Sequence, residues 1–371
     1  MKYLKYIILI AFFLPNIVFG ANRYWVGGSA TWDSSTTANW STSSGGSGGA
    51  SVPTSSDDVF FDSASGSVTV NTGGSAVSVA NNINFTGFTG TMAIDSVESL
   101  EVYGNLTLAT GMSVSGTGYL RFYCAGTCDF TSNGKTVTAD IVLLGAGTVK
   151  QQDALTINRG LSIENSASTW DTNWYDITLT TLTYPAVGTV NFRGSDVSFT
   201  GSGNCLNVGS GTLTSATSTV TFGSSCTGMI IGGTAMYDVV INAPLTSFSI
   251  TGNGSQSFNN LTRASTGQAL LTLNSDITVN GTFTVTGFST STRAEVRSNT
   301  QGQTRTITAN AVALTNVDFD DITGAGSATW SGLGLGDRLG NSGITFNPSQ
   351  TYYWICGTGN WTNPLCWSNT S

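Results

Sequence analysis

Short triplets, in which two apolar residues flank one polar residue, recur along most of this chain of 371 residues. Side chains alternate between the two faces of a β-strand, so each triplet places its apolar pair on one face and its polar residue on the other. No window of about 11 residues keeps an apolar stripe at helical spacing, so we expect almost no helix. The triplets are VTV (68–70), VSV (77–79), INF (83–85), LEV (100–102), LTL (106–108), LTI (155–157), LSI (161–163), ITL (177–179), VNF (190–192), VSF (197–199), VTF (220–222), FSI (248–250), LTL (271–273), ITV (277–279), FTV (283–285) and VDF (317–319).

Glycine, asparagine, aspartate and serine separate these strands, and several strands fall within every stretch of roughly 20 to 25 residues. Such a pattern is typical of a chain that coils and stacks each turn on the one before. We therefore predict an all-β chain folded as a right-handed parallel β-helix (β-solenoid), with about ten turns between Val68 and Phe319. The alternative is a series of tandem β-sandwiches, which would need longer alternating strands joined by hairpin turns.

A segment near the start of the chain, YWVGGSATW at 24–32, returns near its end as YWICGTGNW at 353–361. In both copies two tryptophans stand seven residues apart, which indicates a long repeating module. The second copy stops soon after it begins, so we interpret the chain as one repeat of a larger extracellular protein or as a truncated gene product. The predicted parts are a signal peptide at 1–20, a Trp-rich cap with a Gly/Ser segment at 21–62, the solenoid at 63–347 and the start of a second, truncated module at 348–371.

An open solenoid exposes backbone hydrogen-bonding groups at its ends, so we expect a cap. Trp25, Trp32 and Trp40 can cover the first turn, while Gly27 and Gly28 allow the chain to bend tightly. Carbohydrate binding by these tryptophans is the alternative, because an exposed indole ring offers an apolar face to a sugar.

The first residues have the three parts of a secretory signal peptide. Lys2 and Lys5 make a basic start, an apolar core runs over 7–14, and Gly20 is the small residue after which we expect cleavage. The apolar core is short for a membrane span, and an uncleaved anchor is the alternative. We therefore predict a secreted or cell-surface protein without a transmembrane segment in the mature chain.

The charge of the mature chain narrows its partners. Cleavage would leave 11 basic and 21 acidic residues. Nucleic-acid phosphates need clustered lysine and arginine, so we expect no nucleic-acid partner. Charged residues are only 9 % of the chain, and 46 glycines and many hydroxyl and amide side chains take their place. The candidate partners that remain are surface glycans, other cells and further modules of the same polypeptide.

Six cysteines in an exported chain favour disulfides. Cys205 and Cys226 lie about one solenoid turn apart, which places them on adjacent turns within bonding range. A zinc site is not favoured, because the chain has no histidine and no paired CxxC motifs, and we expect no cofactor. The other disulfide candidates form two local pairs, Cys124 with Cys128 and Cys356 with Cys366.

The lack of histidine also removes the commonest general base, so catalysis would depend on carboxylates. The densest group is Asp318, Asp320 and Asp321. Asp318 and Asp320 should project from one face of a strand, and paired acids are what glycoside hydrolysis requires. Solvated turn carboxylates or a weak calcium site explain the group more simply. We therefore predict a non-enzymatic protein, with a carbohydrate-active enzyme as the alternative.

One interior segment, STWDTNWYD at 168–176, interrupts the rhythm of the triplets. Its large aromatic residues alternate with polar ones, a composition suited to stacking on a sugar ring and bonding its hydroxyls. We predict a ligand site formed by Trp170, Asp171, Trp174 and Tyr175. The alternative is an aromatic loop packed over one turn of the solenoid.

Three stretches carry a family resemblance: the opening YWVGG…W…NWS, the element VPTSSDDVFFD at 52–62 and the closing stretch 293–346. They resemble a module repeated in large secreted bacterial proteins and in some phage-associated proteins, and are similar to elements preceding the β-strand repeats of autotransporter-type adhesins. The resemblance implies a β-helical surface or matrix protein and brings no catalytic residues. We predict an adhesin or rigid spacer; the alternatives are a polysaccharide-degrading or glycan-binding β-helix protein and a phage tail or appendage protein.

Overall fold

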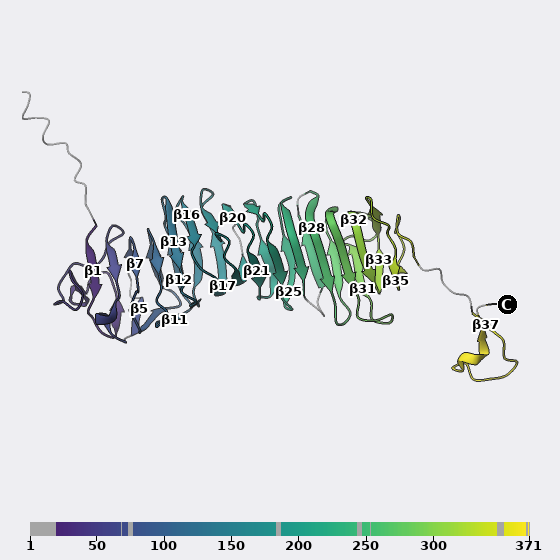
Figure 1. The fold of residues 1–371 in the computed structure, drawn as a ribbon, viewed down its shortest axis with the longest axis horizontal. Coiled ribbons are helices and arrows are strands. Elements are labelled where there is room, and N and C mark those ends of the chain that lie inside the picture. Colours follow the sequence, from purple (N-terminus) through teal and green to yellow (C-terminus); the bar gives the residue numbers. More distant parts are fainter. Residues whose placement is uncertain are drawn as a thin grey trace, which may run out of the picture.

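The computed structural model describes residues 20–67, 69–72, 77–182, 187–242, 247–252, 254–346, 352–368 and 370. Within these residues the chain is all-β, and its parallel coils stack into a β-solenoid of about 12 turns (Figure 1). The predicted solenoid is confirmed, and the tandem sandwiches are wrong because strands on successive turns pair in parallel rather than as hairpins. The predicted signal peptide lies outside the described residues, apart from Gly20. No helix in the described part is long and apolar enough to cross a membrane.

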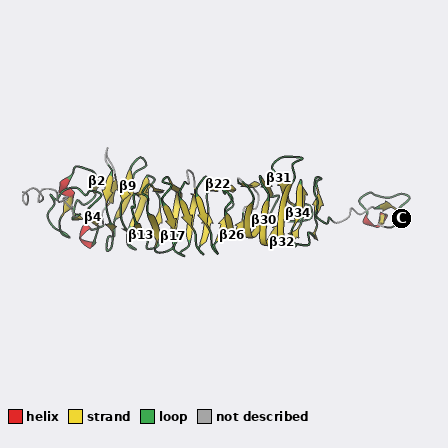
Figure 2. Cartoon of the chain, turned by 90° about the horizontal axis from the view of Figure 1, so that it is seen from above, coloured by secondary structure: helices red, strands yellow, loops and turns green. Residues whose placement is uncertain are grey.

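Three sheets make up the solenoid, which Figure 2 shows from above. Sheet A contains, in spatial order, β23 (Thr212–Thr214), β20 (Thr189–Asn191), β18 (Thr169–Asp171), β16 (Thr148–Gln151), β13 (Thr127–Thr131), β10 (Leu106–Thr107), β7 (Ile83–Asn84), β4 (Asp58–Phe60), β1 (Asn22–Trp25) and β3 (Trp40–Ser41). Sheet B contains β11 (Ser113–Gly116), β8 (Thr91–Ile94), β5 (Thr69–Thr72) and β2 (Ala30–Trp32).

Sheet C contains the remaining strands of the solenoid, and in its later turns each strand pairs with the strand two places further along the chain. Its strands are β6 (Ser78–Ala80), β9 (Ser99–Val102), β12 (Tyr119–Phe122), β14 (Thr136–Val137), β15 (Asp140–Leu143), β17 (Leu155–Ile163), β19 (Ile177–Leu182), β21 (Asp196–Phe199), β22 (Gly203–Asn207), β24 (Thr219–Phe222), β25 (Cys226–Ile230), β26 (Ala235–Ile241), β27 (Ser247–Thr251), β28 (Gln256–Ala264), β29 (Leu270–Leu273), β30 (Ile277–Thr286), β31 (Ala294–Ser298), β32 (Arg305–Thr315), β33 (Val317–Asp320), β34 (Ile322–Ala325), β35 (Gly332–Leu333) and β36 (Gly336–Asp337). The 3₁₀ helices of the described part are η1 (Thr37–Asn39), η2 (Ser63–Ser65) and η3 (Pro364–Cys366).

Apolar residues of successive turns form columns along the solenoid axis. Leu100, Leu120 and Ile141 occupy one such column, each paired directly with the next. Most turns have the predicted length of roughly 20 to 25 residues. The extremes are 19 residues at the step from β24 to β26 and 30 residues at the step from β30 to β32, where longer loops lie on either side of β31. The longest turn thus brings extra loop residues to the surface of the solenoid.

The triplets face as predicted, with one exception. The central Thr107 and Thr178 are partly exposed and Thr69 is exposed, while the apolar residues beside them are buried. The triplet at 77–79 is reversed: Ser78 is buried and its neighbours are not. The register of β6 with β9 places Ser78 on the inner side, where its hydroxyl donates to the Trp32 carbonyl at 2.8 Å. Val68 of the first triplet lies outside the described residues.

The predicted N-terminal cap is in place. The side chains of Trp25, Trp32 and Trp40 are fully buried, and their rings pack edge to face with centroids 5.1 Å apart in two of the three pairs. Phe61, which follows β4, lies against all three indoles. Since β1 also pairs in parallel with β4, the cap is continuous with the first turn of the solenoid. Burial leaves these indole rings no accessible face for a sugar, so they act in packing.

The second Trp segment folds into the same hairpin as the first. In the first copy β1 pairs antiparallel with β3, and in the second β37 (Tyr353–Trp354) pairs antiparallel with β38 (Trp367–Ser368) in the same register. A 3₁₀ helix precedes the second strand of each hairpin, and the Trp354 and Trp367 rings meet edge to face at 5.3 Å. The copies differ in burial: Trp32 is 1 % exposed and its equivalent Trp361 is 73 % exposed.

All three predicted cysteine pairs lie at bonding distance. Cys205 and Cys226 belong to adjacent turns, on β22 and β25, with Cα atoms 5.6 Å apart. The two local pairs have Cα separations of 6.0 Å and 4.9 Å, and the described part contains no free cysteine. The second local pair links β37 to the end of η3 and so closes the second hairpin.

We expect the exported protein to contain the Cys205–Cys226 bond, because both thiols are buried and already face each other across one turn. Changing both residues to alanine should lower the free energy of unfolding by about 3 kcal/mol, since the bond closes a loop of intermediate length. Non-reducing peptide mapping checks the pairing. Free thiols at both positions, or either cysteine bonded elsewhere, would contradict this pairing.

Candidate functional site

The predicted ligand segment forms the end of β18 and the turn that leads to β19. Trp170 lies at the centre of β18 and points inward, between Val149 on the turn before and Val190 on the turn after. Its ring is completely buried and meets Phe130 edge to face at 6.4 Å. The prediction that Trp170 contacts a ligand is therefore wrong: the alternation of the strand turns this side chain into the core.

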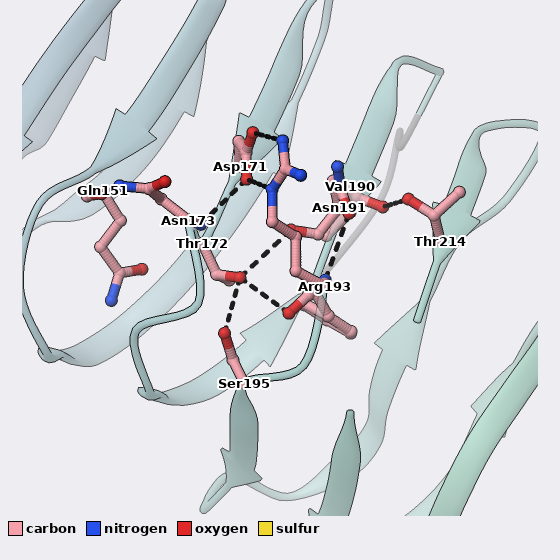
Figure 3. A network of polar contacts seen from close by, with 10 residues as sticks. Gln151, Asp171, Thr172, Asn173, Val190, Asn191, Arg193, Ser195 and Thr214 are labelled. Carbon is pink, nitrogen blue, oxygen red and sulfur yellow. Dashed lines mark hydrogen bonds and ion pairs between the residues drawn. The ribbon is translucent and has the colours of Figure 1, made fainter. Parts of the chain in front are cut away.

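Asp171 is also buried, but it holds the turn to its neighbour. Its carboxylate accepts two hydrogen bonds from Arg193, from Nε at 2.7 Å and from Nη2 at 2.6 Å (Figure 3). Burial raises the pKa of Asp171, but the hydrogen bonds from Arg193 and from the Asn173 N–H outweigh it, so the pKa lies below its ordinary value of 3.8. The pair therefore stabilises the fold above about pH 4, and this contribution is lost as the pH falls through the lowered pKa.

Hydroxyl groups fix the turn from the inside. The Thr172 hydroxyl donates to the Phe192 carbonyl at 2.8 Å and accepts from the Ser195 hydroxyl at 2.8 Å (Figure 3). Asn173 and Trp174 both have left-handed backbone angles, with φ of 51° and 71°. Such angles are costly for residues other than glycine, so the surrounding hydrogen bonds must hold them. The result is a rigid turn that directs Trp174 away from the core.

Trp174 and Tyr175 form the exposed part of the segment, with 61 % and 41 % of their surfaces accessible. The indole of Trp174 lies across Gly194 on the next turn. A Cβ at position 194 would be 2.8 Å from the ring atom Cζ3, so only glycine leaves the ring its place. A supported indole with most of its surface in solvent is the geometry that stacks on a sugar ring. Two of the four predicted residues therefore make the candidate site.

The three aspartates near the end of the solenoid do not converge. Asp318 pairs with Arg293 at 2.9 Å, and Asp320 is the cross-strand neighbour of Arg297. Asp321 is buried, with a carboxylate oxygen accepting from the Gly302 N–H at 2.6 Å. No group of three or more His, Cys, Asp or Glu side chains in the described residues is arranged to hold a metal ion, which removes the support for calcium here.

Two residues of the site were not predicted. Arg193 and Gly194 belong to the turn after Trp174, and their role depends on stacking between turns. A signal was present for Arg193, because it lies 22 residues after Asp171, close to one turn, and carries the opposite charge. Gly194 is one of 46 glycines and had no distinguishing mark.

The site can bind but shows no arrangement for catalysis at Trp174. The only carboxylate that the segment holds in its polar network, Asp171, is buried and saturated by Arg193, and the exposed groups are aromatic. Comparison with protein-family models, with curated protein sequences and with solved structures found no match. The geometry of the solenoid and of this turn is thus the basis for a function.

Proposed function

We propose that this chain is a non-enzymatic extracellular rod, a cell-surface adhesin or matrix spacer, that contacts glycans through Trp174 and Tyr175. The observation that carries the proposal is the exposed indole supported on Gly194, in a turn that hydrogen bonds hold rigid. A preorganised aromatic platform loses little conformational entropy on binding. The paired cysteines fit an oxidising, extracellular environment.

The shape of the solenoid supports a role as a spacer. About 12 turns at about 4.8 Å per turn give a rod roughly 60 Å long. Its walls carry columns of hydroxyls rather than charges, which keep the rod hydrated and resist nonspecific association. On sheet A one column consists of five threonines on consecutive turns, none of them buried: Thr127, Thr148, Thr169, Thr189 and Thr212.

A glycan array probed with the full chain, followed by calorimetric titration of the best ligand, tests the proposal. We expect Trp174→Ala to weaken binding about tenfold or more, because a central stacked aromatic contributes well over 1 kcal/mol. Gly194→Ala should also weaken binding, since its Cβ would displace the indole without removing it. Tyr237→Ala, a change at an exposed aromatic of another turn, is the matched control and should leave affinity unchanged.

The same protein tests the enzymatic alternative. Release of reducing sugar from a polysaccharide panel by the wild-type chain, lost in Asp318→Asn and Asp320→Asn, would move the assignment to a carbohydrate-active enzyme. Binding that survives both Trp174→Ala and Gly194→Ala would remove the turn as the contact. Because Asp318 already pairs with Arg293, we expect no release.

A further inference from the structure

A second polar hollow lies far along the rod from Trp174, on the wall formed by β27, β29, β31, β33 and β36. Two adjoining cavities of about 360 Å³ and 220 Å³ open there and share Gln268 and Glu295. Ser247, Leu270, Glu295, Asp318 and Gly336 are paired in register, each with the next. The hollow thus runs along the solenoid axis over five strands, roughly 19 Å from first to last. We call it the axial groove.

Charged side chains gather in the axial groove although they are scarce elsewhere. Arg293 pairs with Asp318 at 2.9 Å, Arg338 pairs with Glu295, and Arg297 lies 4.0 Å from Glu295. Three of the 13 basic residues of the chain therefore meet at one place. A guanidinium has five N–H donors, and Arg293 uses two groups, donating to Asp318 and to the Thr290 carbonyl. These pairs keep hydrogen-bonding capacity for a ligand.

The rim and floor of the axial groove are built to stay open. The loop before β31 is held by its own hydroxyls: Ser289 Oγ accepts from the Thr292 N–H at 2.9 Å. Phe288 of this loop is largely exposed beside the groove lining. On the floor, a Cβ at Gly336 would lie 2.1 Å from Asp318 Oδ1 and 2.5 Å from Arg293 Nη1. Glycine at 336 therefore makes room for the ion pair.

The chemistry of the lining selects the kind of ligand. The carboxylates of Glu295 and Asp318 neutralise the facing guanidiniums, so a phosphate or carboxylate ligand would meet like charges. A sugar hydroxyl both donates and accepts, and can bind a carboxylate and a guanidinium of the same pair. An extended glycan repeats along its length with a rise close to the strand spacing, so successive sugars can meet successive turns.

We propose that the axial groove binds a neutral, extended oligosaccharide of about four sugars, roughly one for each step between turns. This site is separate from Trp174, which lies on the turn between β18 and β19. Two glycan sites at different heights would let one rod hold two chains, or one long chain twice, with a gain in avidity. The groove extends the proposed function and does not depend on the Trp174 site.

Calorimetric titration of the full chain with cellotetraose, chitotetraose and mannotetraose tests the groove, with a uronate tetramer as the charged comparison. We expect at least one neutral tetramer to bind, and Gly336→Ala and Glu295→Gln each to weaken it tenfold or more. Ser291→Ala on the rim should weaken it several-fold without touching the ion pairs. Arg305→Gln, which removes an exposed arginine outside the groove lining, is the control and should have no effect.

The variants also separate the two sites. Binding that is lost in Gly336→Ala and kept in Trp174→Ala assigns the ligand to the groove. The reverse pattern, or binding of the uronate tetramer alone, would overturn the proposal, as would the absence of binding by every neutral tetramer. Circular dichroism at rising temperature shows that each variant is folded, and if Gly336→Ala does not fold, Ser291→Ala and Glu295→Gln decide.

Discussion

Trp32→Ala should destabilise the first turns of the solenoid by about 3 to 5 kcal/mol, and Trp361→Ala should cost less than about 1 kcal/mol. The two residues occupy equivalent positions of the same hairpin, so chemistry and local backbone are matched. Trp32 is 1 % exposed and packs on Trp40 and Phe61, whereas Trp361 is 73 % exposed. The difference between the variants therefore measures what the first turn adds to the hairpin.

Native-state hydrogen exchange is the right measurement, because a solenoid unfolds turn by turn and loses stability locally. In Trp32→Ala we expect faster exchange in β1, β4 and β7, with the turns from β24 onward unchanged. The variant should also form oligomers on size-exclusion chromatography, because loss of the cap exposes the edge of the first turn. Equal effects of the two substitutions would show that Trp32 is not part of a cap.

The alternation of apolar and polar residues was enough to predict the fold. A period of two fixes which residues face inward within a strand, and the short spacing of strands leaves little choice but stacked turns. The failure at 77–79 shows the limit of the pattern. Val77 and Val79 are the apolar pair, yet the register with β9 turns Ser78 inward, where the Trp32 carbonyl satisfies its hydroxyl.

Polar residues inside the solenoid could not have been predicted from apolar patterning. Gln151 is fully buried, and its amide donates to the carbonyls of Asp153 and Asp176, which belong to successive turns. Gln256 donates to the Gly254 carbonyl at another bend. Arg263 is also buried, and desolvation lowers its pKa to about 10. Such side chains satisfy backbone at bends, a requirement that a sequence read strand by strand does not reveal.

The candidate sites depend on which residues of neighbouring turns meet, and this was the hardest part to predict. Turn length varies from 19 to 30 residues, so the partner of a given residue on the next turn cannot be found by counting. The ion pair of Asp171 with Arg193 and the axial groove both arise from this lateral register. Cys205 and Cys226 were the exception, since a disulfide tolerates only adjacent positions.

Trp170→Ala should lower the free energy of unfolding by about 3 to 5 kcal/mol, although the sequence suggested a surface residue. The ring fills the core between Val149 and Val190, and its removal leaves a cavity that the two flanking turns cannot close. Trp174→Ala, four residues later, should change stability by less than about 1 kcal/mol, because most of that ring is in solvent. Urea unfolding followed by circular dichroism compares the two.

Trp170→Phe distinguishes loss of volume from loss of the indole N–H. Among the described residues the Trp170 Nε1 has no hydrogen-bond partner, so its removal takes away a desolvated donor rather than a bond. We therefore expect Trp170→Phe to cost clearly less than Trp170→Ala, about 1 to 2 kcal/mol, from the smaller ring alone. A cost equal to that of alanine would mean that the N–H is bonded, and glycan binding lost in Trp170→Phe with stability intact would return this ring to the ligand site.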